Sequence, residues 1–322
     1  MRKYSIIIPV YNRPEEIKEL LSSLTCQTYK NFEVIVVEDG STLNCESIVS
    51  SFNDKLDIRY YYKKNSGQGF SRNFGYERAL GDYFIVYDSD CIIPPHYLQA
   101  VEDYLNSEYL DAFGGPDCSH PDFTAIQKAI SYSMTSFFTT GGIRGGRKRV
   151  GGAFHPRSFN MGISRRVFQV TGGYILPKMG EDIEFSIRII RNGFKTGLIR
   201  DAYVYHKRRT NFKQFFKQLH FFGRARINVY RFFKEELKPV HFMPACFTLF
   251  FFFTLVSLVF SSAISCFSLS ILFLYSVLIF VHSSIENKSI YIGILSVAAV
   301  YTQLNAYGIG FIQEGIKELL RK

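Results

Sequence analysis

The stretch that decides the fold is Tyr83-Phe84-Ile85-Val86-Tyr87-Asp88-Ser89-Asp90, in which an apolar run leads into two carboxylates. A short apolar run bounded by turn residues is typical of a buried strand. Two carboxylates two residues apart, at the point where a strand gives way to a loop, suit a divalent cation. Proteins hold Mg²⁺ through one or two carboxylates together with phosphate oxygens and water. The triplet Asp88-Ser89-Asp90 therefore predicts either a metal site or a solvated polar turn.

Strands and helices alternate around this stretch, which predicts a parallel sheet with helices on both faces. Asn12 is expected to cap the first helix. Residues 114–158 are less regular and include a basic, glycine-rich loop at 141–158. The expected strands are 5–10, 32–37, 58–62, 83–87 and 160–163, with a strand pair at 196–199 and 202–205; the expected helices begin at 14, after 41, and cover 69–80, 94–105, 165–170 and 181–192.

Charge is unevenly distributed along the 322 residues, whose formal net charge is +10. Residues 205–238 contain ten Lys or Arg and only two acids, interleaved with Phe at helical spacing. This composition predicts a basic interfacial helix over 210–238 that contacts anionic headgroups or phosphates. No zinc-finger or RNA-recognition motif supports a nucleic-acid partner. The six cysteines form no C-x-x-C pair, which favours a reducing compartment.

The C-terminal part of the chain is apolar. Residues 239–285 contain no Asp, Glu, Lys or Arg, and 289–313 form a second uncharged run in which Gln303 and Asn305 lie near the middle. A membrane span needs about 20 apolar residues. We therefore predict a transmembrane region at 239–313 and a short charged tail at 314–322; the region contains two spans, at about 241–261 and 265–285, and either a third at 290–312 or a re-entrant segment.

Several polar groups fall at predicted carboxyl ends of strands, where ligands bind in such sheets. Asp39 follows the second strand and is either a turn residue or an acceptor for a base or a ribose hydroxyl. The glycine-rich turn at 66–73 leads into a helix, so its N–H groups and Arg72 are candidates for holding phosphate. His206 follows a late strand and is either a surface histidine or a ligand of metal or phosphate.

Gly180-Glu181-Asp182 begins a predicted helix with adjacent carboxylates. Acidic residues there commonly offset the helix dipole. A carboxylate at the rim of the same cleft would instead serve as a general base. Both readings stay open on sequence grounds.

In order, Ile8-Pro9-Val10-Tyr11-Asn12, Val37-Glu38-Asp39-Gly40-Ser41, Asp88-Ser89-Asp90, Asn160-Met161-Gly162 and Gly180-Glu181-Asp182 resemble the motifs of a family 2 glycosyltransferase. The resemblance covers about residues 4–230. It implies a GT-A fold: a Rossmann-like mixed sheet with helices on both faces, forming a catalytic domain at 1–209.

The resemblance also implies roles on the donor side. Pro9, Tyr11 and Asp39 would line the nucleobase pocket, and Arg72 would lie near the diphosphate. The triplet would hold the nucleotide sugar and the metal, Mg²⁺ or Mn²⁺: Asp90 would be a ligand, Asp88 would contact ribose or metal, and Ser89 would lie beside them. His206 would be a further metal or diphosphate contact.

On the acceptor side, Asp182 would be the general base, with Glu181 as neighbour or substitute. Asn160 and Gly180 belong to the same motifs and are expected on that side. Gln218 and Arg224 partly resemble the Q-x-x-R-W motif of processive synthases. The spacing differs and the Trp is missing, which favours transfer of a single sugar.

The implied protein is a membrane-attached, metal-dependent, inverting glycosyltransferase of the type that builds bacterial exopolysaccharide or lipid-linked glycans. Its donor would be a nucleotide-diphosphate sugar, with UDP-sugar favoured, and its acceptor a polyprenyl-linked sugar or a growing glycan. The basic segment before the first span places the catalytic domain on the cytoplasmic side of the inner membrane. The alternatives are an inactive nucleotide-sugar-binding scaffold subunit and a nucleotidyltransferase.

Overall fold

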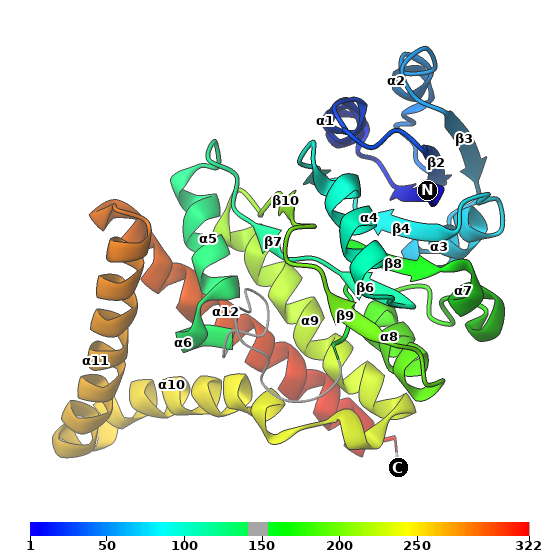
Figure 1. Ribbon diagram of the computed structural model, residues 1–322. Helices are drawn as coiled ribbons and strands as arrows, with labels where there is room; N and C mark the ends of the chain where they lie inside the picture. Colours follow the sequence, from blue (N-terminus) through cyan, green and yellow to red (C-terminus); the bar gives the residue numbers. More distant parts are fainter. Residues whose placement is uncertain (141–153, 322) are drawn as a thin grey trace. The chain divides into compact units, whose positions relative to one another are not determined.

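The structure, a computed structural model, describes residues 1–140 and 154–321 and consists of two compact units (Figure 1). The first unit contains residues 1–120 and 154–207, and the second contains 121–140 and 208–321. Most of the basic loop expected at 141–158 lies outside the described residues.

The first unit is built on a seven-stranded sheet in the order β3-β2-β1-β4-β8-β6-β9. The four strands β3, β2, β1 and β4 are parallel, β8 runs antiparallel to both β4 and β6, and β9 is parallel to β6. The expected mixed α/β sheet is therefore confirmed. The strands are β1 (Tyr4–Val10), β2 (Phe32–Asp39), β3 (Ile58–Lys63), β4 (Tyr83–Tyr87), β6 (Ala112–Gly114), β8 (Asn160–Ser164) and β9 (Thr196–Leu198).

Helices cover both faces of this sheet because alternate strand residues point to opposite sides. Ile6 and Ile8 of β1 belong to one buried cluster, whereas Ile7 belongs to the other. Helices α1 (Pro14–Thr25), α2 (Glu46–Ser50) and α4 (Tyr97–Ser107) contribute to the first cluster, and α3 (Gln68–Tyr76), α7 (Arg165–Thr171) and α8 (Glu181–Arg191) contribute to the second.

A second, three-stranded sheet has the order β5-β10-β7. It contains β5 (Cys91–Ile92), β7 (Asp117–Cys118) and β10 (Val204–His206). The strand pair expected at 196–199 and 202–205 is wrong, because β9 joins the large sheet beside β6 while β10 lies between β5 and β7. Ile199 and Ala202 are buried in the core, so the segment between these strands carries the chain from one sheet to the other.

The cap expected at Asn12 is also wrong. Asn12 has a φ of +53°, and its Oδ1 accepts the N–H groups of Thr42 at 2.9 Å and Leu43 at 3.0 Å. Its side chain therefore ties the end of β1 to the loop after β2. Helix α1 begins with Pro14 instead, whose missing N–H needs no partner in the first turn.

The second unit is helical. Helix α5 was not expected in the irregular stretch after 114, although Thr124 and Gln127 form a capping box at its start. Ser261 alone separates α10 from α11. The helices are α5 (Ala125–Thr135), α6 (Phe137–Thr140), α9 (Phe212–Phe232), α10 (Met243–Phe260), α11 (Ser262–Glu286) and α12 (Ile290–Leu319), with single 3₁₀ turns η1 (Lys234–Glu236) and η2 (Pro239–Phe242).

Three of these helical segments are long and apolar enough to cross a membrane: Pro239–Phe260, Ser262–Glu286 and Ile290–Leu319. Their mean hydropathy is 2.2, 2.4 and 1.3, so the third is the weakest. The positions agree with the three segments expected from the sequence.

Candidate active site

The carboxyl ends of the parallel strands bring polar side chains to one edge of the large sheet. Arg13 follows β1, Asp39 and Lys63 end β2 and β3, and the acidic triplet follows β4. Asn160 reaches the same edge because β8 is antiparallel and begins opposite Tyr87. These residues therefore lie at the edge where the strand-end rule predicts a ligand site.

Asp90 and His206 form the centre of this edge. Asp90 Oδ1 lies 3.1 Å from His206 Nε2, and this oxygen is buried and accepts no hydrogen bond. The two residues are held by backbone contacts, because His206 pairs with Cys91 across β10 and β5 and the Lys207 N–H donates to the Asp90 carbonyl at 3.0 Å. A buried acceptor without a donor calls for a cation.

The pair fits a divalent metal. Two ligands about 2.1 Å from an octahedral ion and at right angles are roughly 3 Å apart, which matches the separation of Asp90 Oδ1 and His206 Nε2. Cys91 is the third potential ligand nearby. Burial raises the pKa of its thiol well above the ordinary value, so the thiolate that a metal would need is disfavoured. Asp90 and His206 are the residues that would hold the ion.

Arg13 is a site residue that sequence reasoning missed. Its Nη1 lies 2.7 Å from Asp90 Oδ2. Burial alone would raise the pKa of the Asp90 carboxyl, but the neighbouring His206 and Arg13 side chains outweigh it and hold that pKa well below its usual range. The signal was available, since Arg13 lies three residues after the end of β1 at Val10.

Arg72 connects the triplet to the start of α8. It is completely buried, its Nη2 is 2.9 Å from Asp88 Oδ1, and its Nη1 is 3.1 Å from Glu181 Oε1. A guanidinium enclosed in this way has no exposed surface in this structure, and its expected position near the diphosphate stays a prediction. Arg72 acts through the two carboxylates that it holds.

The turn into α8 separates two adjacent carboxylates. Gly180 has a φ of +95°, a left-handed conformation that glycine adopts without strain. Glu181 is buried and bonded to Arg72 and Gln68, and burial raises its pKa against the opposing charge of Arg72. Asp182 has a side chain that is 21% exposed, with Arg157 Nη1 3.5 Å from its Oδ2. Asp182 is therefore the more accessible of the two carboxylates.

Asp39 organises the loop before α3. Its carboxylate accepts from Lys63 Nζ at 2.6 Å and from the N–H groups of Ser66 and Gly67 at 2.9 Å each. Burial alone would raise the pKa of Asp39, but these donors, led by Lys63, lower it. The phosphate cradle expected in this glycine-rich turn is thus corrected: the amides of Ser66 and Gly67 are engaged by Asp39.

The other expected residues divide into two groups. Tyr11 is 53% exposed and Pro9 is half-buried at the same edge, which leaves both available to a flat ring, and Ser89 is buried between the two aspartates. Asn160 is buried, donates to the Ala202 carbonyl at 2.8 Å and accepts from the Tyr97 hydroxyl. Its placement on the acceptor side is therefore corrected, since its side chain is used inside the core.

Gln218 and Arg224 belong to α9 in the second unit. Arg224 Nε donates to Glu314 Oε2 at 3.0 Å. Their role toward an acceptor stays a prediction.

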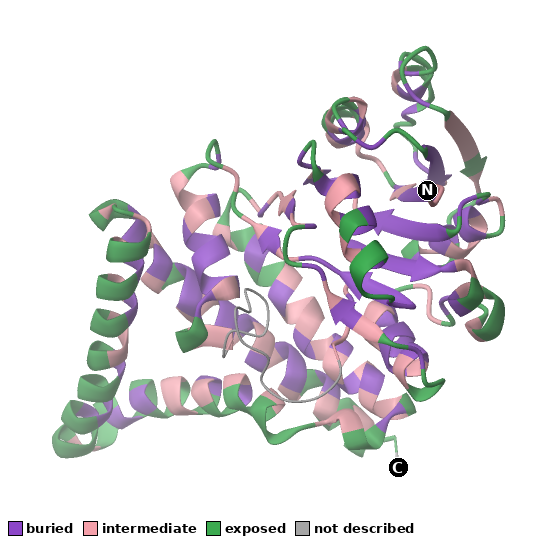
Figure 2. Ribbon diagram, in the orientation of Figure 1, coloured by how far each residue is buried: buried purple, intermediate pink, exposed green. Residues whose placement is uncertain are grey.

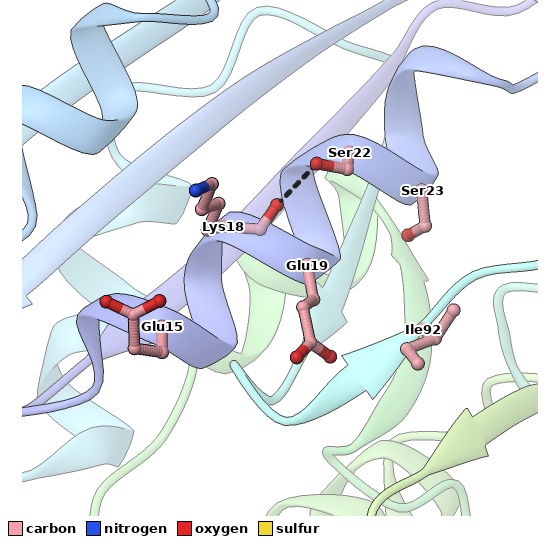
Figure 3. Close-up of a pocket in the computed structure, with 6 residues that line it drawn as sticks. All are labelled: Glu15, Lys18, Glu19, Ser22, Ser23 and Ile92. Atoms are coloured by element: carbon pink, nitrogen blue, oxygen red, sulfur yellow. Dashed lines mark hydrogen bonds between the residues drawn. The ribbon is translucent and has the colours of Figure 1, made fainter. Parts of the chain in front are cut away.

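A shallow surface pocket lies along α1 and β5, where Figure 3 shows carboxylates and a lysine directed outward. The Ser22 hydroxyl donates to the Lys18 carbonyl at 2.8 Å, an ordinary helix contact. None of the site residues described above lines this pocket. Its lining residues are Glu15, Lys18, Glu19, Ser22, Ser23 and Ile92.

Two solved structures share this fold. Staphylococcus aureus TarS, residues 1–349 in complex with UDP-GlcNAc, is 20% identical with a TM-score of 0.51, over 75% of this chain and 70% of that one. The mannosyltransferase PcManGT from Pyrobaculum calidifontis, in complex with GDP-Man and Mn²⁺, is 16% identical with a TM-score of 0.61, over 100% of this chain and 88% of that one. The expected GT-A fold is confirmed.

Sequence relatives agree with the structural ones. An uncharacterised glycosyltransferase of Rickettsia conorii is 45% identical over 104 residues, which cover 32% of this chain and 17% of that protein. The poly(ribitol-phosphate) beta-N-acetylglucosaminyltransferase TarS of Staphylococcus aureus is 36% identical over 132 residues, covering 39% and 21%. The chain thus matches less than a quarter of the length of either relative.

The family model described as glycosyl transferase family 2 matches residues 5–172. This range contains β1 to β4, the acidic triplet and β8, which together build the edge that carries Asp39, Asp88 and Asp90. On this match the chain belongs to glycosyl transferase family 2.

Proposed function

We propose that the chain is a metal-dependent, inverting glycosyltransferase that moves a sugar from a nucleotide-diphosphate sugar to an acceptor hydroxyl. The observation that carries the proposal is the double ion pair of Arg72 with Asp88 and Glu181. Arg72 thereby links Asp88 of the triplet to Glu181, the residue directly before Asp182. This link supports the proposal that the donor site and the candidate base act on one substrate.

The donor side consists of Tyr11, Asp39 and the triplet. A UDP-sugar is favoured, because TarS is a sequence relative and its structure was solved with UDP-GlcNAc. The GDP-Man bound to PcManGT makes a GDP-sugar the main competitor. Asp90 and His206 would hold Mg²⁺ or Mn²⁺, and the bound ion would neutralise charge on the departing diphosphate.

On the acceptor side, Asp182 would take the proton of the attacking hydroxyl. The acceptor oxygen then forms a bond to the anomeric carbon while the bond from that carbon to the diphosphate breaks, and the nucleoside diphosphate leaves. Attack from the face opposite the leaving group inverts the anomeric centre. Glu181 is unsuited to this task, because Arg72 and Gln68 already occupy its carboxylate.

The acceptor we propose is a lipid-linked sugar or a growing glycan. The support is the membrane-compatible second unit: three apolar helical segments and a basic helix, α9, in the same chain as the catalytic unit. The excess of Lys and Arg before the first apolar segment favours a cytoplasmic catalytic unit at the inner membrane.

The test is a donor panel with purified full-length protein in detergent. UDP- and GDP-sugars are supplied with Mn²⁺ and a lipid-linked or oligosaccharide acceptor, and release of nucleoside diphosphate is measured with and without chelator. We expect release from one nucleotide class only, and loss of activity with chelator. Metal-independent transfer would contradict the metal assignment.

Two variants separate binding from catalysis. Asp182→Asn should lower turnover by about 10²–10⁴-fold, the usual contribution of a general base, while donor binding by calorimetry stays unchanged. Asp90→Ala should lose both transfer and metal-dependent donor binding. The exposed Asp54→Asn serves as the matched control. Full activity of Asp182→Asn would remove Asp182 from the mechanism.

The same assay, extended by a reaction with a nucleoside triphosphate and a sugar phosphate, distinguishes the alternatives. A scaffold subunit would bind a nucleotide sugar without releasing diphosphate with any acceptor. A nucleotidyltransferase would release pyrophosphate from a nucleoside triphosphate and a sugar phosphate. Either result would replace the proposal.

A further inference from the structure

The helices α10 and α11 are polar inside and apolar outside. Their buried positions are mostly hydroxyl-bearing residues, with Thr254 fully buried and Ser268 1% exposed. Their exposed positions, which Figure 2 colours green, carry mostly large apolar side chains. Val259 is 80% and Phe260 79% exposed. In water, this exposed apolar surface would be unfavourable. In a lipid bilayer, small polar residues between helices and apolar residues facing outward are the usual arrangement.

Helix α12 has the opposite pattern. Ile292, Val300 and Phe311 are buried, and half of its most apolar stretch is covered by the rest of the unit, compared with 22% for each of the other two segments. Among the described residues of α12, the exposed large apolar side chains occur only near the two ends. They are Ile290, Tyr291, Ile294, Ile316 and Leu319.

Helices α5, α10 and α11 each cover part of α12. Helix α9, with five basic residues and no acid, also packs against α12. The two helices pack closely, because a Cβ at Gly223 would come within 2.1 Å of the Tyr307 carbonyl oxygen and one at Gly310 within 2.2 Å of that of His220. Ion pairs between side chains also connect α9 to α12. Arg231 lies 2.9 Å from Glu314 and 2.7 Å from Glu318, and Arg224 lies 3.0 Å from Glu314.

These contacts decide where α12 can lie. If α12 crossed the bilayer, α9 would enter the hydrocarbon with it, because Phe215 and Leu219 of α9 belong to the same buried apolar cluster as Ala299 and Ala306 in the middle of α12. Three of the basic residues of α9, Lys213, Lys217 and Arg226, have no acidic partner among the contacts of the described residues. Unpaired Lys and Arg are strongly disfavoured in the hydrocarbon, and α9 has the composition of a helix that lies at the interface.

Helices α10 and α11 pack on α12 between residues 296 and 308, and Tyr301 within this stretch contacts both Phe247 of α10 and Leu272 of α11. A Cβ at Gly308 would meet the Pro244 carbonyl oxygen at the start of α10, and Ser283 near the end of α11 donates to Ser296 at 2.7 Å. Residues 296 and 308 are roughly 18 Å apart along a helix. The corner between α10 and α11 at Ser261 lies away from α12, so α12 forms the base of a triangle (Figure 1).

We propose that α10 and α11 enter the bilayer as a helical hairpin and that α12 does not cross it. Helix α12 lies between the hairpin and α9, and both of its ends are on the same side of the membrane as the catalytic unit. This inference rests on the membrane attachment proposed above. It places Lys317 and Arg321 on the same side of the membrane as the basic residues of α9. A third span would instead place them on the opposite side.

The test uses cysteine labelling of the full chain in inverted membrane vesicles with a membrane-impermeant maleimide. The native cysteines supply two probes: Cys26 is exposed on the catalytic unit, and Cys266 is exposed on α11. The new probes are Tyr291→Cys and Lys317→Cys, at exposed positions near the two ends of α12. Each probe is examined singly, with Cys118, Cys246 and the unused probe cysteines replaced by Ser.

We expect Cys26, Tyr291→Cys and Lys317→Cys to be labelled from the same side, and Cys266 to react only after detergent is added. Labelling of Lys317→Cys from the side opposite to Cys26 would overturn the inference and show that α12 crosses. Two other results together would show that the proposed membrane attachment itself is wrong. These are release of the chain from the membrane by alkaline carbonate and labelling of Cys266 without detergent. Retained donor binding confirms that each variant is folded.

Discussion

The Nη2 atom of Arg72 lies 2.9 Å from Oδ1 of Asp88, and the whole arginine side chain is buried. This contact joins the residue that follows β4 to helix α3. Because the same guanidinium also contacts Glu181, its removal affects both sides of the proposed reaction.

Arg72→Met should destabilise the catalytic unit by about 3 kcal/mol, because it leaves the buried Glu181 without its cation. The apparent melting temperature by scanning calorimetry or fluorimetry measures this. Adding Glu181→Gln should recover part of the loss, since the uncompensated carboxylate is gone. A double variant that is no more stable than Arg72→Met would contradict the pairing.

Substitution of the two side chains beside Asp90, His206 and Arg13, should change the affinity for a metal ion in opposite directions. His206→Gln should weaken Mn²⁺ binding, measured by electron paramagnetic resonance without nucleotide. Arg13→Gln should strengthen it by about tenfold, because the guanidinium 2.7 Å from Asp90 repels the ion and competes for the carboxylate. Equal weakening in both variants would show that Arg13 supports the ion instead of competing with it.

Acid should destabilise the sheet through Glu33. Burial acts to raise the pKa of this carboxyl, but Ser5, the Leu80 N–H at 2.6 Å and Arg59 outweigh it and lower the pKa. A lowered folded pKa stabilises the fold above the unfolded value of about 4.3, and the benefit disappears as the pH falls through the folded pKa. The melting-temperature gap between wild type and Glu33→Gln should therefore be largest near neutral pH and shrink below about pH 4. A gap that is constant down to pH 3 would contradict this.

Glu314→Gln should loosen α9 from α12 by about 2 kcal/mol, because Arg224 and Arg231 both lose a charged acceptor. Hydrogen exchange in α9, measured by mass spectrometry in detergent, should rise, while exchange in β1 and β4 stays constant. Lys317→Gln, on the exposed side of α12, is the control. Equal exchange in both variants would show that the ion pairs add little to the helix contact.

Much of the fold follows from the sequence because the parallel strands are short apolar runs that end in polar turns. The position of Asp39 and of the triplet at one edge followed from that rule alone. The pairing of β9 and β10 did not, since each is three residues long and bonds to a strand distant in the chain. Helix α5 was missed because its apolar residues are interleaved with Ser and Gln.

The members of the site were easier to foresee than their contacts. Asp90, His206 and Asp182 were expected, but Arg13, Lys63 and Arg157, which pair with Asp90, Asp39 and Asp182, were not. Arg72 is a candidate for holding phosphate on sequence grounds because it lies just after a glycine-rich turn that leads into a helix. Only the structure shows two acids closing over it. Charge pairs of this kind depend on tertiary distances that periodicity does not contain.

The proposed metal ligands come from different sheets: Asp90 follows β4, and His206 ends β10. Their separation is therefore set by the register between β10 and β5, in which His206 lies opposite Cys91. A slip of one residue would turn His206 to the other face and bring Tyr205 to its place, because side chains alternate along a strand. An insertion in the segment that precedes β10 would then remove the cation site without altering any of its residues.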